Sequence, residues 1–179
     1  MKKIDFHIHT VPSISDSHFD FDIDSLKEYV DLLEIDCIAI TNHNLFDKNQ
    51  YKQLADELEA KVFPGIEIDL EGGHLLLISE NENLDDFTAK AQKVNDLINS
   101  PSDDISYDEL VEIYGELNNY LLIPHYDKKP NIKSTTLEKL GDNIFAGEVA
   151  SLRKFKSCIK EADKLTPVIF SDGRFIADM

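Results

Sequence analysis

Short apolar segments alternate with longer amphipathic segments along most of this chain, a pattern typical of strands and helices that follow one another in turn. The apolar segments predict strands at residues 3–10, 37–41, 61–63, 65–69, 74–79, 120–124, 144–149 and 167–170. The amphipathic segments predict helices at residues 24–34, 49–58, 84–99, 106–117, 137–140 and 152–164. Continuous apolar strands alternating with helices indicate a parallel sheet covered on both faces. We therefore expect an α/β domain shaped as a closed or nearly closed barrel of roughly seven strands.

Local residues mark several element boundaries. Asp24 is a candidate N-cap for the helix at 24–34, and Ser106 with Glu109 fits a capping box for the helix at 106–117. The pair at 64–65, Pro-Gly, predicts a turn or kink between two extended segments. The pair at 72–73, Gly-Gly, predicts a chain break before the next strand.

Histidines and acidic residues recur where these strands end. His7 and His9 are two residues apart in the first strand, so their side chains point to the same face. Further residues of this kind lie at or just after the ends of later apolar segments: His43, Glu67, His74, His125 and Asp172. Functional residues of α/β barrels gather at the C-terminal ends of the strands. The pattern therefore predicts a polynuclear metal site at that end of the barrel.

Glu67 is the most informative acidic residue, because it lies between two isoleucines. A carboxylate is costly to bury unless it is paired or binds a metal, and a glutamate can bridge two metals. Asp16 is a weaker candidate ligand in a Ser/Asp-rich loop, where local turn bonding is common. Glu148 could be a ligand or a structural partner, and His18 is interpreted as a surface residue.

The amino-acid composition limits the classes of partner that this protein can bind. The chain has 179 residues with 35 acidic and 18 basic side chains, giving a formal net charge of −17, which disfavours nucleic-acid binding through bulk attraction. No apolar run approaches the ~20 residues needed to span a membrane, and the N-terminus lacks the apolar core of a signal peptide. Cys37 and Cys158 are interpreted as reduced thiols. These features predict a cytoplasmic protein without a membrane partner.

The ordered motifs resemble those of one family. They are His7-x-His9-Thr10, Asp16, Thr41-Asn42-His43, Gly65-Ile66-Glu67-Ile68, Gly73-His74, Pro124-His125 and Ser171-Asp172. This set is similar to the motifs of the PHP (polymerase and histidinol phosphatase) superfamily, and it covers almost the entire chain in the family's order. The resemblance implies a distorted (β/α)7 barrel, formed here by a single domain over residues 1–179, with a trinuclear metal centre at the C-terminal ends of the strands.

The resemblance also assigns ligands. It implies that His7, His9, Glu67 and Asp172 hold a first metal, and that Glu67 bridges to a second metal held by His74 and His125. Asp16 and His43 resemble ligands of a third metal. The cofactors implied are two to three divalent ions, Zn²⁺, Mn²⁺ or Fe²⁺.

Two positions depart from the family pattern. Asn42 stands where the family usually has Asp, which removes a carboxylate from the edge of the site. The last motif reads Asp172-Gly173-Arg174 instead of Asp-x-His, and an arginine cannot ligate a metal because it stays protonated. We predict that Arg174 takes a catalytic part by binding substrate phosphate, and Arg153 is a second candidate for phosphate binding.

The predicted chemistry is hydrolysis of a phosphate ester by a metal-activated water, with a phosphorylated small molecule or nucleotide as substrate. Two alternatives stay open. The chain ends soon after Asp172 without a helix that closes the barrel, as in the N-terminal nuclease module of a larger, ATPase-linked protein. The loss of the last-motif histidine instead suits a non-catalytic, metal-stabilised interaction module.

Overall fold

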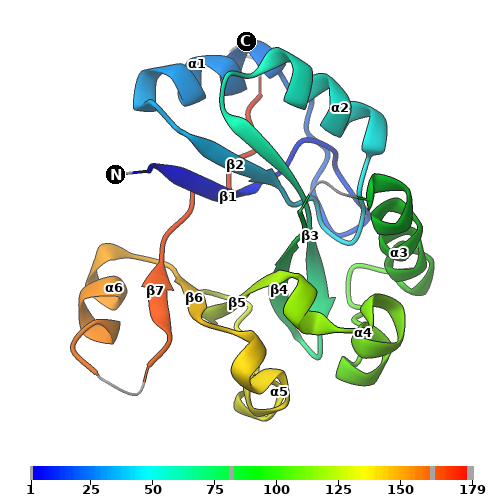
Figure 1. Ribbon diagram of the computed structural model, residues 1–179. Coiled ribbons are helices and arrows are strands. Elements are labelled where there is room, and N and C mark those ends of the chain that lie inside the picture. Colours follow the sequence, from blue (N-terminus) through cyan, green and yellow to red (C-terminus); the bar gives the residue numbers. More distant parts are fainter. Residues whose placement is uncertain (1, 81–82, 162–163, 177–179) are drawn as a thin grey trace.

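The computed structural model describes residues 2–80, 83–161 and 164–176. Among them, seven strands form one sheet whose spatial order follows the sequence. The strands are β1 (Ile4–Ile8), β2 (Cys37–Ile40), β3 (Lys61–Leu70), β4 (Gly73–Ile78), β5 (Leu121–Asp127), β6 (Ala146–Val149) and β7 (Thr166–Val168). The sheet curls into an arc, and the helices lie on its outer side (Figure 1). The α/β class and the number of strands agree with the sequence prediction.

Six α-helices are present in the described ranges. They are α1 (Ile23–Leu33), α2 (Lys48–Glu57), α3 (Leu84–Leu97), α4 (Tyr107–Tyr114), α5 (Ser134–Leu140) and α6 (Leu152–Cys158), with 3-10 turns η2 (Leu117–Asn119) and η3 (Gly141–Asn143). The predicted N-cap of α1 was wrong, because Asp22 is in the extended conformation and accepts a hydrogen bond from the backbone N–H of Ser25. The predicted capping box of Ser106 and Glu109 is confirmed.

Helix α6 is shorter than predicted. It ends at Cys158, where the predicted helix continued to residue 164, and residues 162–163 of that prediction lie outside the described residues. Cys158 is buried and Cys37 is partly buried, and both are free thiols, as predicted. Within the described ranges, no helix combines the length and apolar character that a membrane crossing requires.

The prediction of an all-parallel sheet was wrong for β4, which pairs antiparallel with both β3 and β5. The reason is the short connection between β3 and β4, since parallel neighbours need a long crossover. Glu71 and Gly72 both have positive φ, 46° and 81°, which is the backbone of a tight hairpin turn. Glu71 and Gly72 thus form a turn between neighbouring strands, and Gly73 opens β4, where we had expected only a chain break.

The predicted interruption at Pro64 and Gly65 was also wrong, since β3 runs through both residues. Pro64 is the last residue of β3 that pairs with β2, and Gly65 is the first that pairs with β4. The pair therefore marks a change of partner strand instead of a turn. A Cβ atom on Gly65 would lie 2.8 Å from Thr41 Cγ2, which explains the need for glycine at this crossing.

The C-terminal segment runs from β7 past β1 to α1 (Figure 1). Gly173 forms an isolated parallel bridge with Ile8, and its carbonyl accepts a hydrogen bond of 2.9 Å from the N–H of His9. Further along, the carbonyl of Phe175 accepts from the N–H of Asp22 at 2.8 Å. These bonds hold Gly173 against the end of β1 and Phe175 against the start of α1.

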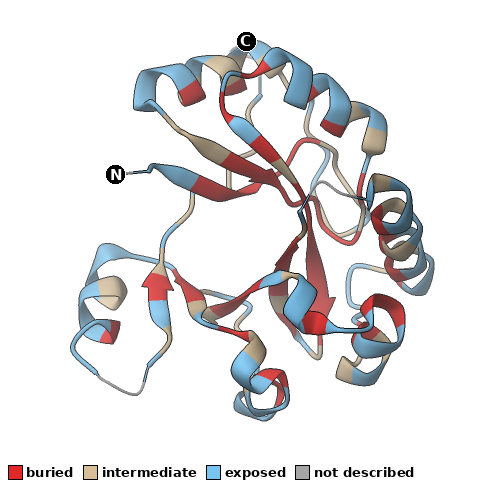
Figure 2. Ribbon diagram, viewed as in Figure 1, coloured by how far each residue is buried: buried red, intermediate tan, exposed pale blue. Residues whose placement is uncertain are grey.

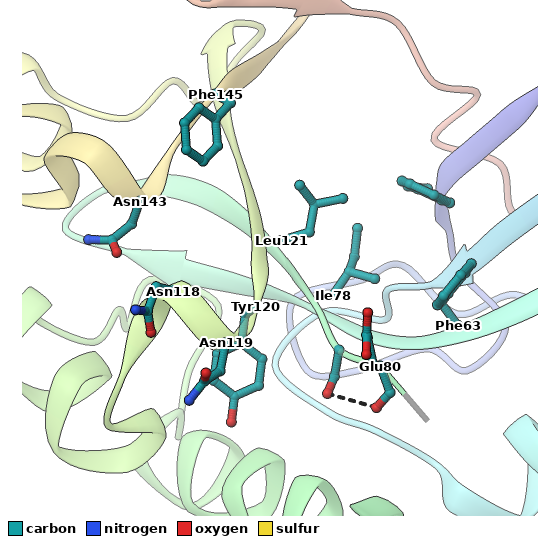
Figure 3. A pocket seen from close by; sticks show the side chains of 11 residues that line it. Phe63, Ile78, Glu80, Asn118, Asn119, Tyr120, Leu121, Asn143 and Phe145 are labelled. Atoms are coloured by element: carbon teal, nitrogen blue, oxygen red, sulfur yellow. Dashed lines mark hydrogen bonds between the residues drawn. The ribbon is translucent and has the colours of Figure 1, made fainter. Parts of the chain in front are cut away.

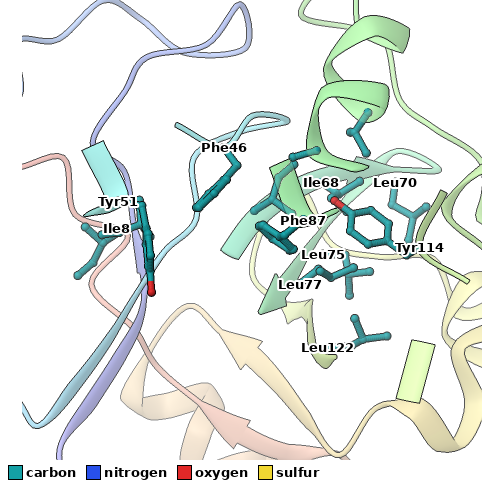
Figure 4. Close-up of a cluster of buried hydrophobic side chains, with 14 of the residues drawn as sticks. Ile8, Phe46, Tyr51, Ile68, Leu70, Leu75, Leu77, Phe87, Tyr114 and Leu122 are labelled. Atoms are coloured by element: carbon teal, nitrogen blue, oxygen red, sulfur yellow. The ribbon is translucent and has the colours of Figure 1, made fainter. Parts of the chain in front are cut away.

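The curled sheet has two different faces. Its outer face packs against the helices through a large apolar core that includes Ile66, Ile68, Leu75 and Leu77 (Figures 2 and 4). A smaller inner cluster consists of Phe6, Ala39, Leu76, Ile78 and Ile123. Helices thus cover only the outer face, because the curl lets the inner face pack on itself. Strand alternation places Glu67, His74 and His125 on this inner face, beyond the apolar cluster.

The other end of the sheet carries a separate cavity of about 340 Å³. Figure 3 shows its lining, which includes Phe63, Ile78, Leu121 and Phe145. None of the predicted metal ligands lines it. Phe6 and Ile78 of the apolar inner cluster contribute to its wall.

Glu71 connects the β3–β4 turn to two helices, and its charge predicts a pH-dependent contribution to stability. Its carboxylate accepts hydrogen bonds from the Thr136 hydroxyl, from Lys139 Nζ at 3.0 Å and from the Tyr107 N–H at 3.2 Å. These bonds lower the pKa of Glu71 from 4.5 to about 2. A lowered carboxyl pKa stabilises the fold above the unfolded pKa, and this stabilisation is lost as the pH falls towards the folded pKa.

We expect Glu71→Gln to lower the free energy of unfolding by about 1–3 kcal/mol at neutral pH. The difference from the wild type should shrink as the pH falls from about 5 towards about 2, because the wild-type carboxyl then becomes protonated. Urea unfolding of both proteins across this range measures the effect. A difference that stays constant with pH would show that the charge of Glu71 makes no contribution.

Candidate metal centre

The predicted ligands come from the same edge of the sheet. His7 lies in β1 and His9 follows it, while Glu67, His74 and His125 lie in β3, β4 and β5. The remaining three are in connecting segments, namely Asp16, His43 and Asp172. His43 is held at the edge by a parallel bridge to Glu67, and Asp172 by the bonds of Gly173 to β1. Parallel pairing of β1, β2 and β3 brings their C-terminal ends together, and the hairpin returns His74 to the same place.

One group of donor atoms surrounds Oε2 of Glu67. The Nε2 atoms of His7 and His9 lie 3.0 Å and 3.2 Å from this oxygen and 3.0 Å from each other. Asp172 Oδ1 completes the group, at 3.5 Å from His7 Nε2 and 3.2 Å from His9 Nε2. Two imidazoles and two carboxylates therefore point their lone pairs at one small volume, which is a common donor set for a divalent metal.

A second group surrounds the other oxygen of the same carboxylate. His74 Nδ1 lies 2.6 Å from Glu67 Oε1, and His125 Nε2 lies 3.2 Å from it. Glu67 is almost completely buried, with 1% of its side chain exposed. Its two oxygens thus face two separate groups of imidazoles, an arrangement that suits a carboxylate bridging two metals.

His43 and Asp16 lie on the remaining side of Glu67. His43 Nε2 is 3.2 Å from Glu67 Oε2 and 3.9 Å from Asp16 Oδ1. The His43 ring stacks on His9, with 4.8 Å between ring centroids. The structure therefore brings all eight predicted ligands to one centre.

The donor chemistry of this centre fits a divalent cation. Within the described residues, both ring nitrogens of the buried His125 lack a hydrogen-bond partner, and its Nε2 faces Glu67 Oε1. Near the other oxygen of Glu67, the Nε2 atoms of His7 and His9 are only 3.0 Å apart, so at least one of the two presents a lone pair to the centre. Buried polar groups normally have partners, and a metal ion is the partner that converging lone pairs accept.

Electrostatics give the histidines contrasting pKa values. Burial opposes a charge on His7 and His74, but neighbouring carboxylates outweigh it and raise the pKa of each to about 9. Burial dominates at His43, where it lowers the pKa to about 4, and it also lowers the pKa of His125. Burial would raise the pKa of Glu67, yet the facing histidines hold this pKa well below its usual range. The bridging position is therefore anionic.

Comparison with known proteins agrees with this geometry. The model of the PHP domain matches residues 5–164 of the chain. The chain belongs to the PHP family. No curated protein sequence matches it significantly. The structure of PsfC from Pseudomonas syringae PB-5123 is similar, with 18% identity and a TM-score of 0.63 over 97% of this chain and 77% of that one. A "putative metal-dependent phosphoesterase" from Bifidobacterium adolescentis ATCC 15703 has 10% identity and a TM-score of 0.56, over 97% of this chain and 88% of that one.

The sequence analysis left open whether Glu148 is a metal ligand or a structural partner. In the structure it lies behind the histidines of the PHP centre. Its Oε2 is 2.8 Å from His7 Nδ1 and 3.3 Å from His125 Nε2, and its side chain is 1% exposed. A carboxylate on the outer nitrogen of His7 fixes the ring and leaves Nε2 facing the centre. Burial would raise the pKa of Glu148, but hydrogen bonds with the two histidines and the charge of His7 hold it at about 2.

Lys128 also reaches the centre. Its side chain is only 13% exposed, and Nζ contacts Glu148 Oε1 at 2.7 Å and Asp172 Oδ2 at 3.1 Å. It follows β5 directly, so the strand carries it to the centre just after His125. Its position just after a strand end is the sequence feature that could have predicted this. A single lysine in a Lys/Pro-rich loop is not distinctive, however, so the feature is weak.

Asp69 is the residue that sequence reasoning missed. Its Oδ1 lies 2.9 Å from His74 Nε2 and 3.8 Å from His43 Nδ1, while Oδ2 accepts hydrogen bonds from Asn44 Nδ2 and Ser15 Oγ. Asp69 is two residues beyond Glu67 in β3 and shares its face, so strand alternation could have predicted it. A cavity of about 160 Å³ next to the centre is lined by Asp69, His74, Gly73 and Pro130, among others.

Other predicted positions have different surroundings. Arg174 reaches the centre, but its guanidinium contacts Asp16 and Asp172. Arg153 is exposed on α6 and lines a surface cavity with Leu152, Lys156, Ser157 and Lys160, none of which is a predicted ligand. His18 is exposed, as predicted.

Asn42 stabilises the turn after β1. Its Oδ1 accepts hydrogen bonds from the N–H groups of Thr10, at 2.6 Å, and Val11, at 2.9 Å. The amide therefore has a structural part at the edge of the site, where the family usually has a carboxylate.

Proposed function

We propose that this PHP-family protein is a metal-dependent phosphoesterase that hydrolyses the ester bond of a small phosphorylated molecule or nucleotide. The observation that carries the proposal is the buried carboxylate of Glu67, which has three imidazole nitrogens within 3.2 Å of Oε2 and two within 3.2 Å of Oε1. The similarity in fold to the Bifidobacterium protein supports the same reaction class.

Divalent metals in such a centre supply an activated water and bind phosphate oxygens. The residues of this chain would hold them in two places. His7, His9, Glu67 and Asp172 would bind one ion, and Glu67, His74 and His125 the other. Zn²⁺ suits the imidazole-rich donors, and Mn²⁺ or Fe²⁺ suits the mixed set equally well.

A second layer of residues positions these ligands. Glu148 orients His7 from behind, at 2.8 Å, and Asp69 lies at the outer nitrogen of His74, at 2.9 Å. Such carboxylate–histidine pairs fix the ring and raise its basicity, and losing one typically costs about 10–100-fold in metal affinity or activity. Lys128 compensates the buried charge of Glu148.

A small substrate is favoured over a nucleic acid by charge. The chain carries a formal net charge of −17, and the two cations nearest the centre, Lys128 and Arg174, are both paired with acids. A polymer of phosphates needs an extended basic surface to bind. The proposal is therefore a phosphomonoesterase or small-molecule phosphoesterase.

The function is tested by measuring metal content and turnover together. Protein purified without chelator is expected to contain at least two metal ions per chain by elemental analysis. It should hydrolyse p-nitrophenyl phosphate in the presence of Mn²⁺, Zn²⁺ or Fe²⁺, and lose this activity after chelation.

Each other result is informative. Bound metal without turnover of monoesters, diesters or single-stranded DNA would contradict the proposal and favour a non-catalytic module. Turnover of DNA alone would favour the nuclease alternative. Absence of bound metal under all three ions would contradict the ligand assignment itself.

A further inference from the structure

We propose that Arg174 is a permanent cation of this centre, held between Asp16 and Asp172, so that the centre binds two divalent metals and not three. The inference rests on the proposed function and adds the number of ions to it. It also changes the predicted role of Arg174. The sequence analysis assigned its guanidinium to substrate phosphate, whereas here the guanidinium binds two carboxylates of the protein itself.

The contacts of Arg174 are directed at these two acids. Nη2 lies 2.9 Å and Nε 3.3 Å from Asp16 Oδ1, while Nη1 lies 3.1 Å from Asp172 Oδ1. A guanidinium is planar and presents its donors as a fork, so it can serve two carboxylates at once. It stays protonated in proteins and offers no lone pair, so it neutralises the acids without ligating a metal.

Asp16 has no oxygen left for a metal. Each of its oxygens accepts two hydrogen bonds, which fill its lone pairs: Oδ1 accepts from Nη2 and Nε of Arg174, and Oδ2 accepts from the backbone N–H of Ser13 at 3.0 Å and from its hydroxyl at 3.1 Å. His43 is the nearest imidazole, but its Nε2 is 3.9 Å from Asp16 Oδ1 and only 3.2 Å from Glu67 Oε2. Both oxygens of this acid are therefore committed to protein donors.

Asp172 is shared but keeps its place in the first group. Its Oδ1 faces His9 Nε2 at 3.2 Å as well as Arg174, and its Oδ2 contacts Lys128 Nζ at 3.1 Å. Arg174 approaches this oxygen from the side of Asp16, and the two histidines approach it from β1. The arginine can therefore remain while His7, His9 and Glu67 bind the first ion.

The charge balance of the centre also favours two bound metal ions. The centre holds five carboxylates, Asp16, Glu67, Asp69, Glu148 and Asp172, and two fixed cations, Lys128 and Arg174. With neutral histidines the formal charge is −3, which two divalent ions change to +1. Three ions would make it +3 in a largely buried volume, where uncompensated charge is costly. A charge of +1 still attracts a phosphate anion.

The number of bound metals tests this inference directly. Metal content is measured by elemental analysis, and titration of metal-free protein with Mn²⁺ is followed by calorimetry. We expect two ions per chain in the wild type. Arg174→His should raise the number to three, because an imidazole removes the positive charge and adds a ligand beside Asp16. Arg174→Lys, the matched control that keeps the charge, should stay at two.

Asp16→Asn gives a second, independent test. The informative quantity is the change from the wild type measured in parallel: if Asp16 serves Arg174, the number of bound ions should not change, whereas a metal-ligating Asp16 would cost one ion. Three ions in the wild type would overturn the inference, and so would a folded Arg174→His variant that still binds two. Absence of metal from every variant would contradict the proposed function instead, so the two failures are distinguishable.

Discussion

Replacement of Glu67 by glutamine is expected to lower the rate of phosphate-ester hydrolysis by about 10³-fold, equivalent to about 4 kcal/mol of transition-state stabilisation. The amide keeps the size of the side chain but loses the charge that faces His7, His9, His74 and His125. Both proposed metal positions share this carboxylate, so the variant should also bind fewer than two ions per chain. Turnover of p-nitrophenyl phosphate and elemental analysis measure the two effects.

Glu71→Gln is the matched control, because Glu71 follows the same strand but faces Thr136 and Lys139 instead of the histidines. This variant should keep full metal content and activity at neutral pH, at a temperature where it remains folded. If Glu67→Gln keeps two ions and more than about a tenth of the wild-type rate, the bridging assignment is wrong.

Removal of metal is expected to destabilise the folded protein substantially. Without an ion, the buried Nε2 of His125 lacks a hydrogen-bond partner, and the Nε2 atoms of His7 and His9 face each other at 3.0 Å next to the buried charge of Glu67. An ion that binds only the folded state at about 100 times its dissociation constant adds about 2.7 kcal/mol. For a chain of this size, that corresponds to a rise in melting temperature of about 5–10 °C.

Scanning calorimetry with Mn²⁺ or with excess chelator measures this difference. Glu67→Gln serves as the control, since its weakened centre should show a much smaller shift between the two conditions. Equal melting temperatures of the wild type with metal and with chelator would show that the cluster binds no ion in the folded state. An equal rise in both proteins would place the stabilising ion elsewhere.

The positions of most candidate ligands followed from local patterns in the sequence. His7 and His9 share a face because strand side chains alternate, and Glu67, His74 and His125 belong to apolar segments that become β3, β4 and β5. The same alternation places Asp69 on the face of Glu67, and the predicted strand at 65–69 ends on it, so both patterns identify it as a candidate. Membership of the PHP family, expected from the motif order, is confirmed by the match over residues 5–164.

The direction of β4 depended on a feature that composition alone does not show. Gly72 and Gly73 were correctly identified as a break, but a break does not say whether the chain turns back or crosses over. The backbone of Glu71, with φ of 46°, makes it a tight turn, and only then does His74 face Asp69 across the hairpin. Pro64 was similarly predicted to interrupt the strand, whereas it marks the point where β3 stops pairing with β2 and begins to pair with β4.

By itself, the sequence determined the identity and order of the donor side chains, their spacing along the strands and the α/β class, because these depend on periodicity within short segments. Only the tertiary structure decided the partners of side chains that are distant in sequence. Arg174 faces Asp16 because the segment after β7 runs beside β1, and Lys128 and Glu148 meet His7 because β5 and β6 curl towards it. Such contacts depend on the curl and closure of the whole sheet, which no local pattern encodes.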